Sequence, residues 1–84
     1  MRRNYLDIYA DILKVAKDGA KKTQIVYKAN LNFKILKEHM NTLMKKGLLD
    51  NSGHYYVTTK QGITFLEYYQ KFNRLTTIIY AGAS

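Results

Sequence analysis

Residues 21–57 read KKTQIVYKANLNFKILKEHMNTLMKKGLLDNSGHYYV and carry the strongest structural signal in this 84-residue chain. Apolar side chains recur at helical spacing on both sides of Asn30, a residue type that tolerates left-handed backbone geometry. The pattern predicts a short helix over residues 24–29, capped by Thr23, and a longer helix over residues 33–46, capped by Asn32. Two helices joined by so tight a turn predict a helix-turn-helix.

After Gly47, which can end the second helix, the pattern changes from helix to strand. Residues 48–50 and 55–57 are short strand candidates, and residues 51–53 (Asn-Ser-Gly) are typical of a tight hairpin turn. A hairpin directly after a helix-turn-helix predicts a wing. The order of these elements distinguishes this fold from others better than any single motif does.

The flanking segments are both predicted to be helices. Residues 4–17 repeat apolar side chains every three or four positions, with Asn4 as the cap and Gly19 as the stop. One of the two threonines at positions 58 and 59 caps a last helix that runs from residue 60 to at least residue 75. A glycine at position 62 makes this helix less stable than an alanine would, by up to about 1 kcal/mol. Close approach to another backbone would explain why a glycine stands there.

The expected fold class is therefore α+β, mostly α: a winged helix-turn-helix with a long C-terminal dimerisation helix. We expect the winged helix-turn-helix core over residues 1–58 and the C-terminal helix and tail over residues 59–84, within a single domain. A chain this short, with no cysteine to form a disulfide, has a marginal core unless a second subunit adds to it.

Charge is unevenly distributed along the chain. The net charge is +8; residues 1–47 hold eleven basic and four acidic residues (+7), and residues 48–84 hold three and two (+1). A basic part beside a nearly neutral part indicates a polyanion-binding region and an assembly region. A generic basic, solvated surface is the alternative.

Residues 21–46 contain seven lysines and a single acid, Glu38. In a helix-turn-helix the second helix lies in the major groove, where Asn reads adenine, Lys reads guanine and Phe touches a thymine methyl group. The candidate base contacts are Asn32, Phe33, Lys34, Lys37 and Asn41. The candidate phosphate contacts are Lys21, Lys22, Thr23 and Lys28, with His54 on the wing. Alternatively, Asn32 is only a cap, the lysines only solubilise, and the wing makes no contact.

The last helix carries a second apolar stripe. Its members follow an a/d pattern over two heptads, which predicts dimerisation through a short coiled coil. They are Phe65, Tyr68, Phe72, Leu75 and Ile79. Ile63, Leu66 and Tyr69 lie on a different face and would pack on the core of the same chain. The alternative is a monomer whose last helix folds back on the first.

Catalysis and metal binding find little support. The two histidines, at positions 39 and 54, have no cysteine near them, and the sequence has neither a glycine-rich phosphate loop nor a nucleophile motif. We expect no enzyme, no cofactor and no metal. Residues 75–83 are too few to span a bilayer, and no targeting segment is evident, so a cytoplasmic protein is expected.

Two runs, residues 21–49 (KKTQIVYKANLNFKILKEHMNTLMKKGLL) and residues 55–72 (YYVTTKQGITFLEYYQKF), resemble archaeal winged-helix proteins. The matching positions are Thr23, Ile25, Tyr27, Ala29, Asn30, Leu31, Leu36, Lys37, Leu43, Gly47, Leu48, Thr58, Lys60 and Gly62. The chain looks most like small crenarchaeal chromatin and regulator proteins that dimerise through a long antiparallel C-terminal helix; similar modules occur in viruses of those hosts. The resemblance implies double-stranded DNA binding, dimerisation and no catalysis. The tail, TTIIYAGAS, departs from it by lacking charged heptads.

We therefore expect a homodimeric protein that binds double-stranded DNA as a transcriptional regulator or chromatin-like protein, with no small-molecule ligand and no membrane partner. A winged-helix module that holds a protein partner and has no DNA role is the alternative from another class. RNA binding, a third option, needs exposed aromatic rings for stacking, and only Phe33, Tyr27 and Tyr55 offer them.

Overall fold

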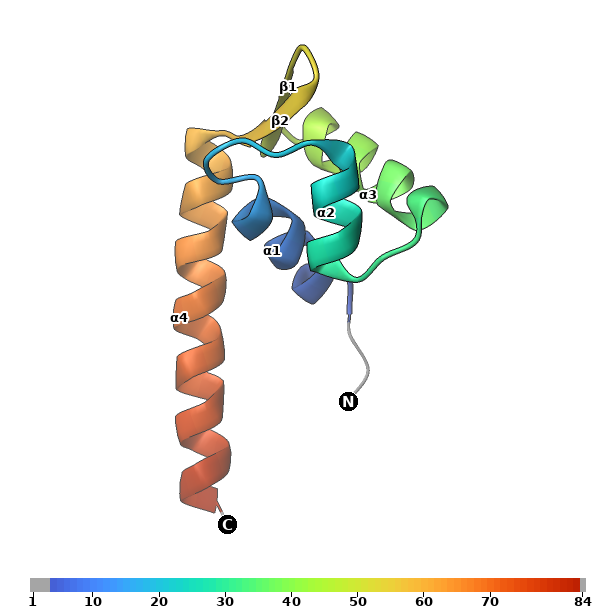
Figure 1. Cartoon of the computed structure of the whole chain (residues 1–84). Coiled ribbons are helices and arrows are strands. Elements are labelled where there is room, and N and C mark those ends of the chain that lie inside the picture. Colours follow the sequence, from blue (N-terminus) through green and yellow to red (C-terminus); the bar gives the residue numbers. More distant parts are fainter. Residues whose placement is uncertain (1–3, 84) are drawn as a thin grey trace.

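The computed structural model describes residues 4–83, and side chains for residues 4–76. In chain order, its elements are α1 (Tyr5–Val15), α2 (Lys22–Ala29), α3 (Phe33–Lys45), β1 (Leu49–Ser52), β2 (Tyr55–Thr58) and α4 (Lys60–Ala83). Figure 1 shows α1, α2, α3 and the hairpin gathered beside the upper part of α4, whose lower part extends beyond them. The expected fold class, a mostly helical winged helix-turn-helix with a long C-terminal helix, is confirmed.

Helix α1 lies at the centre of the packing and contacts α2, α3, α4 and β2. Its start is fixed by Asn4, as predicted: the Asn4 Oδ1 accepts from the backbone N–H of Asp7 at 2.9 Å. Its inward face buries Ile12 and Leu13 completely. These side chains join the buried side chains of the other elements in one core, which includes Ile25, Leu36, Leu43, Leu49 and Leu66. Burial at this centre therefore sets how the helices are placed around α1.

Ala20, in the segment between α1 and α2, forms an isolated β-bridge with Tyr56 of the wing. The backbone N–H of Ala20 donates to the Tyr56 carbonyl at 3.0 Å, and the N–H of Tyr56 donates to the Ala20 carbonyl at 2.8 Å. Gly19, at φ +93°, turns the chain so that Ala20 lies alongside β2. This segment, predicted only as a link, therefore pairs with the second edge of β2 through Ala20.

Two predicted boundaries were wrong: the start of α2 and the position of the hairpin turn. Helix α2 begins at Lys22, not after a Thr23 cap, because Lys21 is still extended and its N–H donates to the Gln24 side chain at 2.8 Å. The hairpin loop is residues 53–54 and not residues 51–53, because Ser52 pairs with Tyr55 and leaves a two-residue loop. Such loops favour a positive φ at their first residue, which Gly53 supplies at +64°.

Two threonines fix the start of α4. Thr59 is the cap, since its hydroxyl oxygen accepts from the Gly62 N–H at 3.1 Å, and it also donates to the Gly47 carbonyl at 2.6 Å. Thr58 is buried instead and donates to the Leu13 carbonyl at 2.6 Å, which satisfies a backbone group near the end of α1. The helix continues to Ala83, in agreement with the predicted minimum at residue 75. Within the described residues no helix combines the length and apolarity needed to cross a membrane.

Candidate nucleic-acid interface

The turn between α2 and α3 has the geometry that its sequence predicted. Asn30 takes the left-handed conformation (φ 56°, ψ 52°), and the Leu31 N–H donates back to the Val26 carbonyl at 3.1 Å. The Asn32 side chain then accepts from the Ile35 N–H at 2.8 Å and starts α3. Three residues therefore join the two helices, and the backbone path between them is fixed by local hydrogen bonds.

Helix α3 buries one face and exposes the other. Leu36, Met40 and Leu43 are buried, as the sequence indicated. The structure places all five candidate base contacts among its exposed residues: Asn32, Phe33, Lys34, Lys37 and Asn41. The opposite face of α3 is therefore polar, basic and open to a partner.

Three of the candidate phosphate contacts, Lys21, Lys22 and Thr23, lie at the start of α2, and Lys28 lies in its last turn. Lys21, Thr23 and Lys28 are exposed, and Lys22 is half-buried. The Lys22 Nζ lies 5.8 Å from the centre of the Phe33 ring, so the start of α2 is next to the start of α3. Thr23 is not the cap, but it remains in the first turn of α2, where the helix dipole favours an anion.

The wing also approaches this region. His54 is exposed at the hairpin loop, and the Lys21 Nζ lies 5.8 Å from the centre of the Tyr55 ring. The sequence indicated His54 as a candidate DNA contact and Tyr55 only as a ring that could stack on RNA bases. In the structure Tyr55, at the start of β2, is exposed, whereas Thr58, at its end, is buried. Through Lys21 and Lys22, the starts of α2 and α3 and the wing thus meet at one place.

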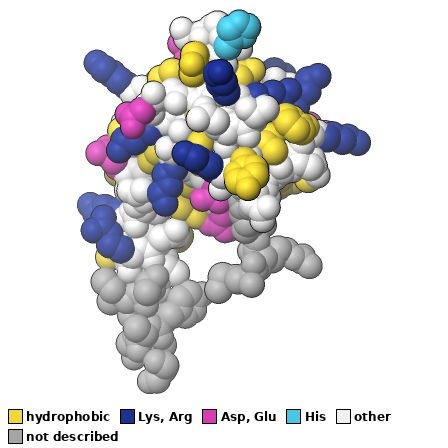
Figure 2. Space-filling model, viewed as in Figure 1, with side chains coloured by type: hydrophobic (Ala, Val, Ile, Leu, Met, Phe, Trp, Pro, Cys, Tyr) yellow, Lys and Arg dark blue, Asp and Glu magenta, His cyan; other side chains and the backbone are white. Residues whose placement is uncertain are grey.

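We call the surface formed by the candidate base and phosphate contacts, together with Lys45 and Lys46, the basic surface. Of the seven lysines in residues 21–46, six are exposed and one is half-buried, against one acid, Glu38. Figure 2 shows basic side chains projecting over the α2 and α3 side of the molecule, and others on the α4 side, with a histidine at the tip of the hairpin. Clustered basic charge on one side of a small domain is the electrostatic footprint expected of a nucleic-acid-binding protein.

A separate apolar stripe runs along α4. Tyr68, Phe72 and Leu75 are 69%, 65% and 53% exposed. Phe65, placed in the same stripe from the sequence, is half-buried, and its ring stacks on Tyr69 with centres 6.2 Å apart. Ile79 lies outside the residues whose side chains the structure describes. The described part of α4 therefore presents three large apolar side chains to solvent.

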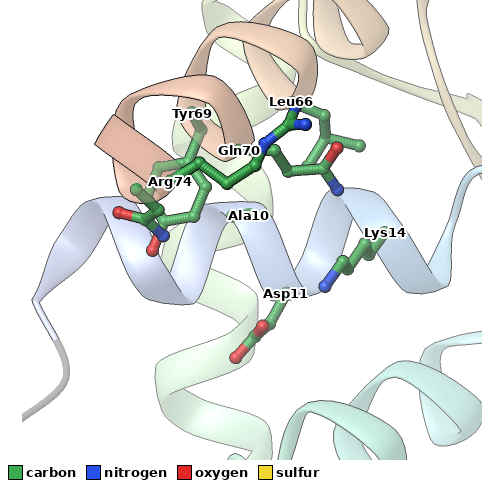
Figure 3. Close-up of a pocket in the computed structure, with 8 residues that line it drawn as sticks. Ala10, Asp11, Lys14, Leu66, Tyr69, Gln70 and Arg74 are labelled. Atoms are coloured by element: carbon green, nitrogen blue, oxygen red, sulfur yellow. The ribbon is translucent and has the colours of Figure 1, made fainter. Parts of the chain in front are cut away.

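A groove with a volume of about 520 Å³ separates α1 from α4 (Figure 3). It is lined by Ala10, Asp11, Lys14, Leu66, Tyr69, Gln70, Asn73 and Arg74. At 3.6 residues per turn, Leu66, Gln70 and Arg74 lie on the opposite side of α4 from the exposed apolar stripe. The groove is therefore distinct from both the stripe and the basic surface. Within residues 4–76, no three His, Cys, Asp or Glu side chains gather as metal ligands would.

The helix-turn-helix, the hairpin after it and the helix that closes the core define a winged helix-turn-helix protein. Residues 2–77 match the winged helix-turn-helix family, and the chain belongs to that family. The resemblance seen in the sequence is thereby confirmed.

One solved structure with the same fold is that of Sso10a-2, a DNA-binding protein from Sulfolobus solfataricus. The TM-score is 0.86 at 21% sequence identity, over 96% of this chain and 90% of that one. At this identity, the likeness shows the fold. A comparison with curated protein sequences finds no match.

Proposed function

We propose that the protein binds double-stranded DNA as a homodimer and acts as a transcriptional regulator or as a chromatin-like protein. The observation that carries the proposal is the meeting of three elements around Lys21 and Lys22, on a surface with seven lysines. The fold is shared with a protein described as DNA-binding, which supports the same partner here. A protein with this role acts in the cytoplasm, on the nucleoid of a cell or, for a viral protein, of its host.

In the proposed complex, α3 enters the major groove. Its thirteen residues span about 20 Å, and the groove is about 12 Å wide, which admits a helix. Asn32, Phe33, Lys34, Lys37 and Asn41 then face base edges. Lys21, Lys22, Thr23 and Lys28 contact phosphates, where the first backbone N–H groups of α2 add donors. His54 meets the backbone or the minor groove beside the wing.

The second subunit is proposed to cover the apolar stripe of α4. Tyr68, Phe72 and Leu75, with Phe65 and Ile79 at the two ends, would form the contact between subunits. The twenty-four residues of α4 span about 36 Å, close to the roughly 34 Å of one DNA helical turn that separates half-sites. A pair of α4 helices in contact along this stripe can therefore hold the helix-turn-helix units of both subunits against one side of a duplex.

A DNA titration at several salt concentrations tests the proposal. If each protomer neutralises about four phosphates, log K falls with log salt at a slope of roughly −7 for the dimer. Random duplex and the upstream region of the protein's own gene are compared, because only a sequence-specific regulator prefers the latter.

The matched control for charge is Lys71→Ala, which removes a positive charge from α4, against Lys22→Ala on the basic surface. We expect only Lys22→Ala to reduce the salt slope, by about one. A flat salt dependence, or no binding at about 50 mM salt, contradicts the proposal and favours a protein-binding module.

A further inference from the structure

Three aromatic side chains lie exposed on the elements of the basic surface. Tyr27 on α2 is 88% exposed, Phe33 on α3 is 52% exposed, and Tyr55 on β2 is 48% exposed. Ile25 and Ala29 make the buried contacts of α2, so the Tyr27 ring contributes little to the core. In Figure 2, hydrophobic side chains stand among the basic side chains over α2 and α3. The aromatic rings are therefore available to a ligand.

Two of these rings already have an ammonium group beside them. The Lys21 Nζ is 5.8 Å from the centre of the Tyr55 ring, and the Lys22 Nζ is 5.8 Å from the centre of the Phe33 ring. Because Lys21 and Lys22 are consecutive, the two rings flank one pair of positive charges. A ring that stacks on a base, next to a cation that pairs with a phosphate, is the arrangement that binds single-stranded nucleic acid.

Double-stranded DNA offers these aromatic rings few favourable contacts. In a duplex, each base is stacked between its neighbours, and a protein reaches only base edges and the backbone. Phe33 can touch a thymine methyl group from α3, but Tyr27 lies on α2, the helix that crosses the phosphate backbone in such complexes. An aromatic ring contributes little binding energy next to a phosphate, whereas it can stack on the whole face of an unpaired base.

We propose that the basic surface also binds single-stranded DNA, with unpaired bases stacked on Tyr27, Phe33 and Tyr55 and phosphates held by Lys21 and Lys22. This inference rests on the proposed function only through the lysines that the two ligands share. A protein with both activities recognises duplexes that contain frayed ends or open segments.

The test measures the binding of a labelled deoxythymidine oligomer of about 12 nucleotides, a length within the range of known single-strand sites, by fluorescence anisotropy. The same measurement is made with a blunt-ended duplex that has no unpaired loop. We expect the oligomer to bind to the full-length protein. The variants Tyr27→Ala and Tyr55→Ala should each bind the oligomer about 5- to 150-fold more weakly, from the loss of one stacked base. Both should bind the duplex as the wild type does.

Two substitutions at one position separate stacking from simple apolar contact. Tyr27→Phe keeps the ring and should retain oligomer binding, whereas Tyr27→Leu keeps apolar bulk without the ring and should match Tyr27→Ala. Because Tyr27 is exposed, none of these variants should lose its fold, and thermal unfolding verifies this.

The outcomes are distinguishable. Absent oligomer binding, or oligomer binding unchanged in Tyr27→Ala and Tyr55→Ala, overturns the inference and leaves duplex binding untouched. Oligomer binding without duplex binding supports the inference and overturns the proposed function. An oligouridine of the same length that binds more tightly than the deoxythymidine oligomer overturns the assignment to DNA in favour of RNA.

Discussion

The hydroxyl of Tyr69 on α4 donates a hydrogen bond to Oδ1 of Asp7 on α1. The other carboxylate oxygen of Asp7 accepts from the Asn4 N–H at 3.2 Å, as part of the capping box of α1. One carboxylate therefore both closes the start of α1 and ties the last helix to the first.

Replacing Tyr69 by Phe should lower the free energy of unfolding by about 1–2 kcal/mol. Hydrogen bonds to charged groups contribute about 1.5–3 kcal/mol, and partial exposure of this pair reduces the effect. Tyr27→Phe is the control, because Tyr27 is 88% exposed and lies outside the proposed contact between subunits, and it should leave stability unchanged. Urea denaturation at one protein concentration measures both. Equal midpoints for Tyr69→Phe and wild type would show that the bond has no net effect.

Gly62 lies so close to the loop before β1 that it tolerates no side chain. A Cβ at this position would come 2.2 Å from the Leu48 carbonyl oxygen and 2.5 Å from the Thr58 Cγ2. The close approach to another backbone that the sequence raised for Gly62 is thus present within the chain itself. Gly62→Ala should cost about 3 kcal/mol or more through overpacking, despite a better helix propensity.

The matched control for Gly62 is Gly53→Ala. At Gly53 an added Cβ meets no atom within 4 Å, and only the positive φ of +64° opposes it, at a cost of about 1–2 kcal/mol. With roughly 4–8 °C lost per kcal/mol in a domain of this size, thermal unfolding separates the two variants. A Gly62→Ala protein that melts as high as Gly53→Ala would contradict the close approach.

Lys37→Ala and Asn41→Ala should each reduce affinity for the preferred duplex by about 1–3 kcal/mol if these exposed side chains of α3 contact bases. Binding to random duplex should fall much less. Lys22→Ala, in contrast, should weaken both duplexes equally, because a phosphate contact carries no sequence information. Competition titrations with the two duplexes measure this ratio. If Lys37→Ala and Asn41→Ala match the wild type on every duplex, α3 is not the reading helix.

The double change Phe72→Lys, Leu75→Lys should convert the dimer to monomers. Each buried side chain of this kind contributes about 1.5–3 kcal/mol, and the change places four charges in one apolar contact. Glu67→Lys with Gln70→Lys adds two lysines to a different face of α4 and should leave the dimer intact. Sedimentation decides the outcome: a wild-type protein at 9.8 kDa, or a double mutant that stays dimeric, places the contact elsewhere.

The sequence predicted those features that depend on residues three or four positions apart. The Asn4 and Asn32 caps, the left-handed Asn30 and the buried stripe of α3 follow from short-range hydrogen bonds and helical periodicity, and all are present. Composition and spacing were also enough to predict the fold class, because the order of the elements permits few other arrangements.

Features that depend on distant segments needed the tertiary structure. Ala20 pairs with Tyr56, thirty-six positions later, and this pairing holds Lys21 extended, so α2 begins at Lys22 and Thr23 is not its cap. The pairing of Ser52 with Tyr55 determines which residues form the hairpin loop. Side-chain chemistry made Lys21, Lys22, Phe33 and Tyr55 candidates for binding one by one. Only the packing of three elements around α1 decided that they meet, because contacts between segments far apart in the chain depend on burial in a common core and not on local pattern.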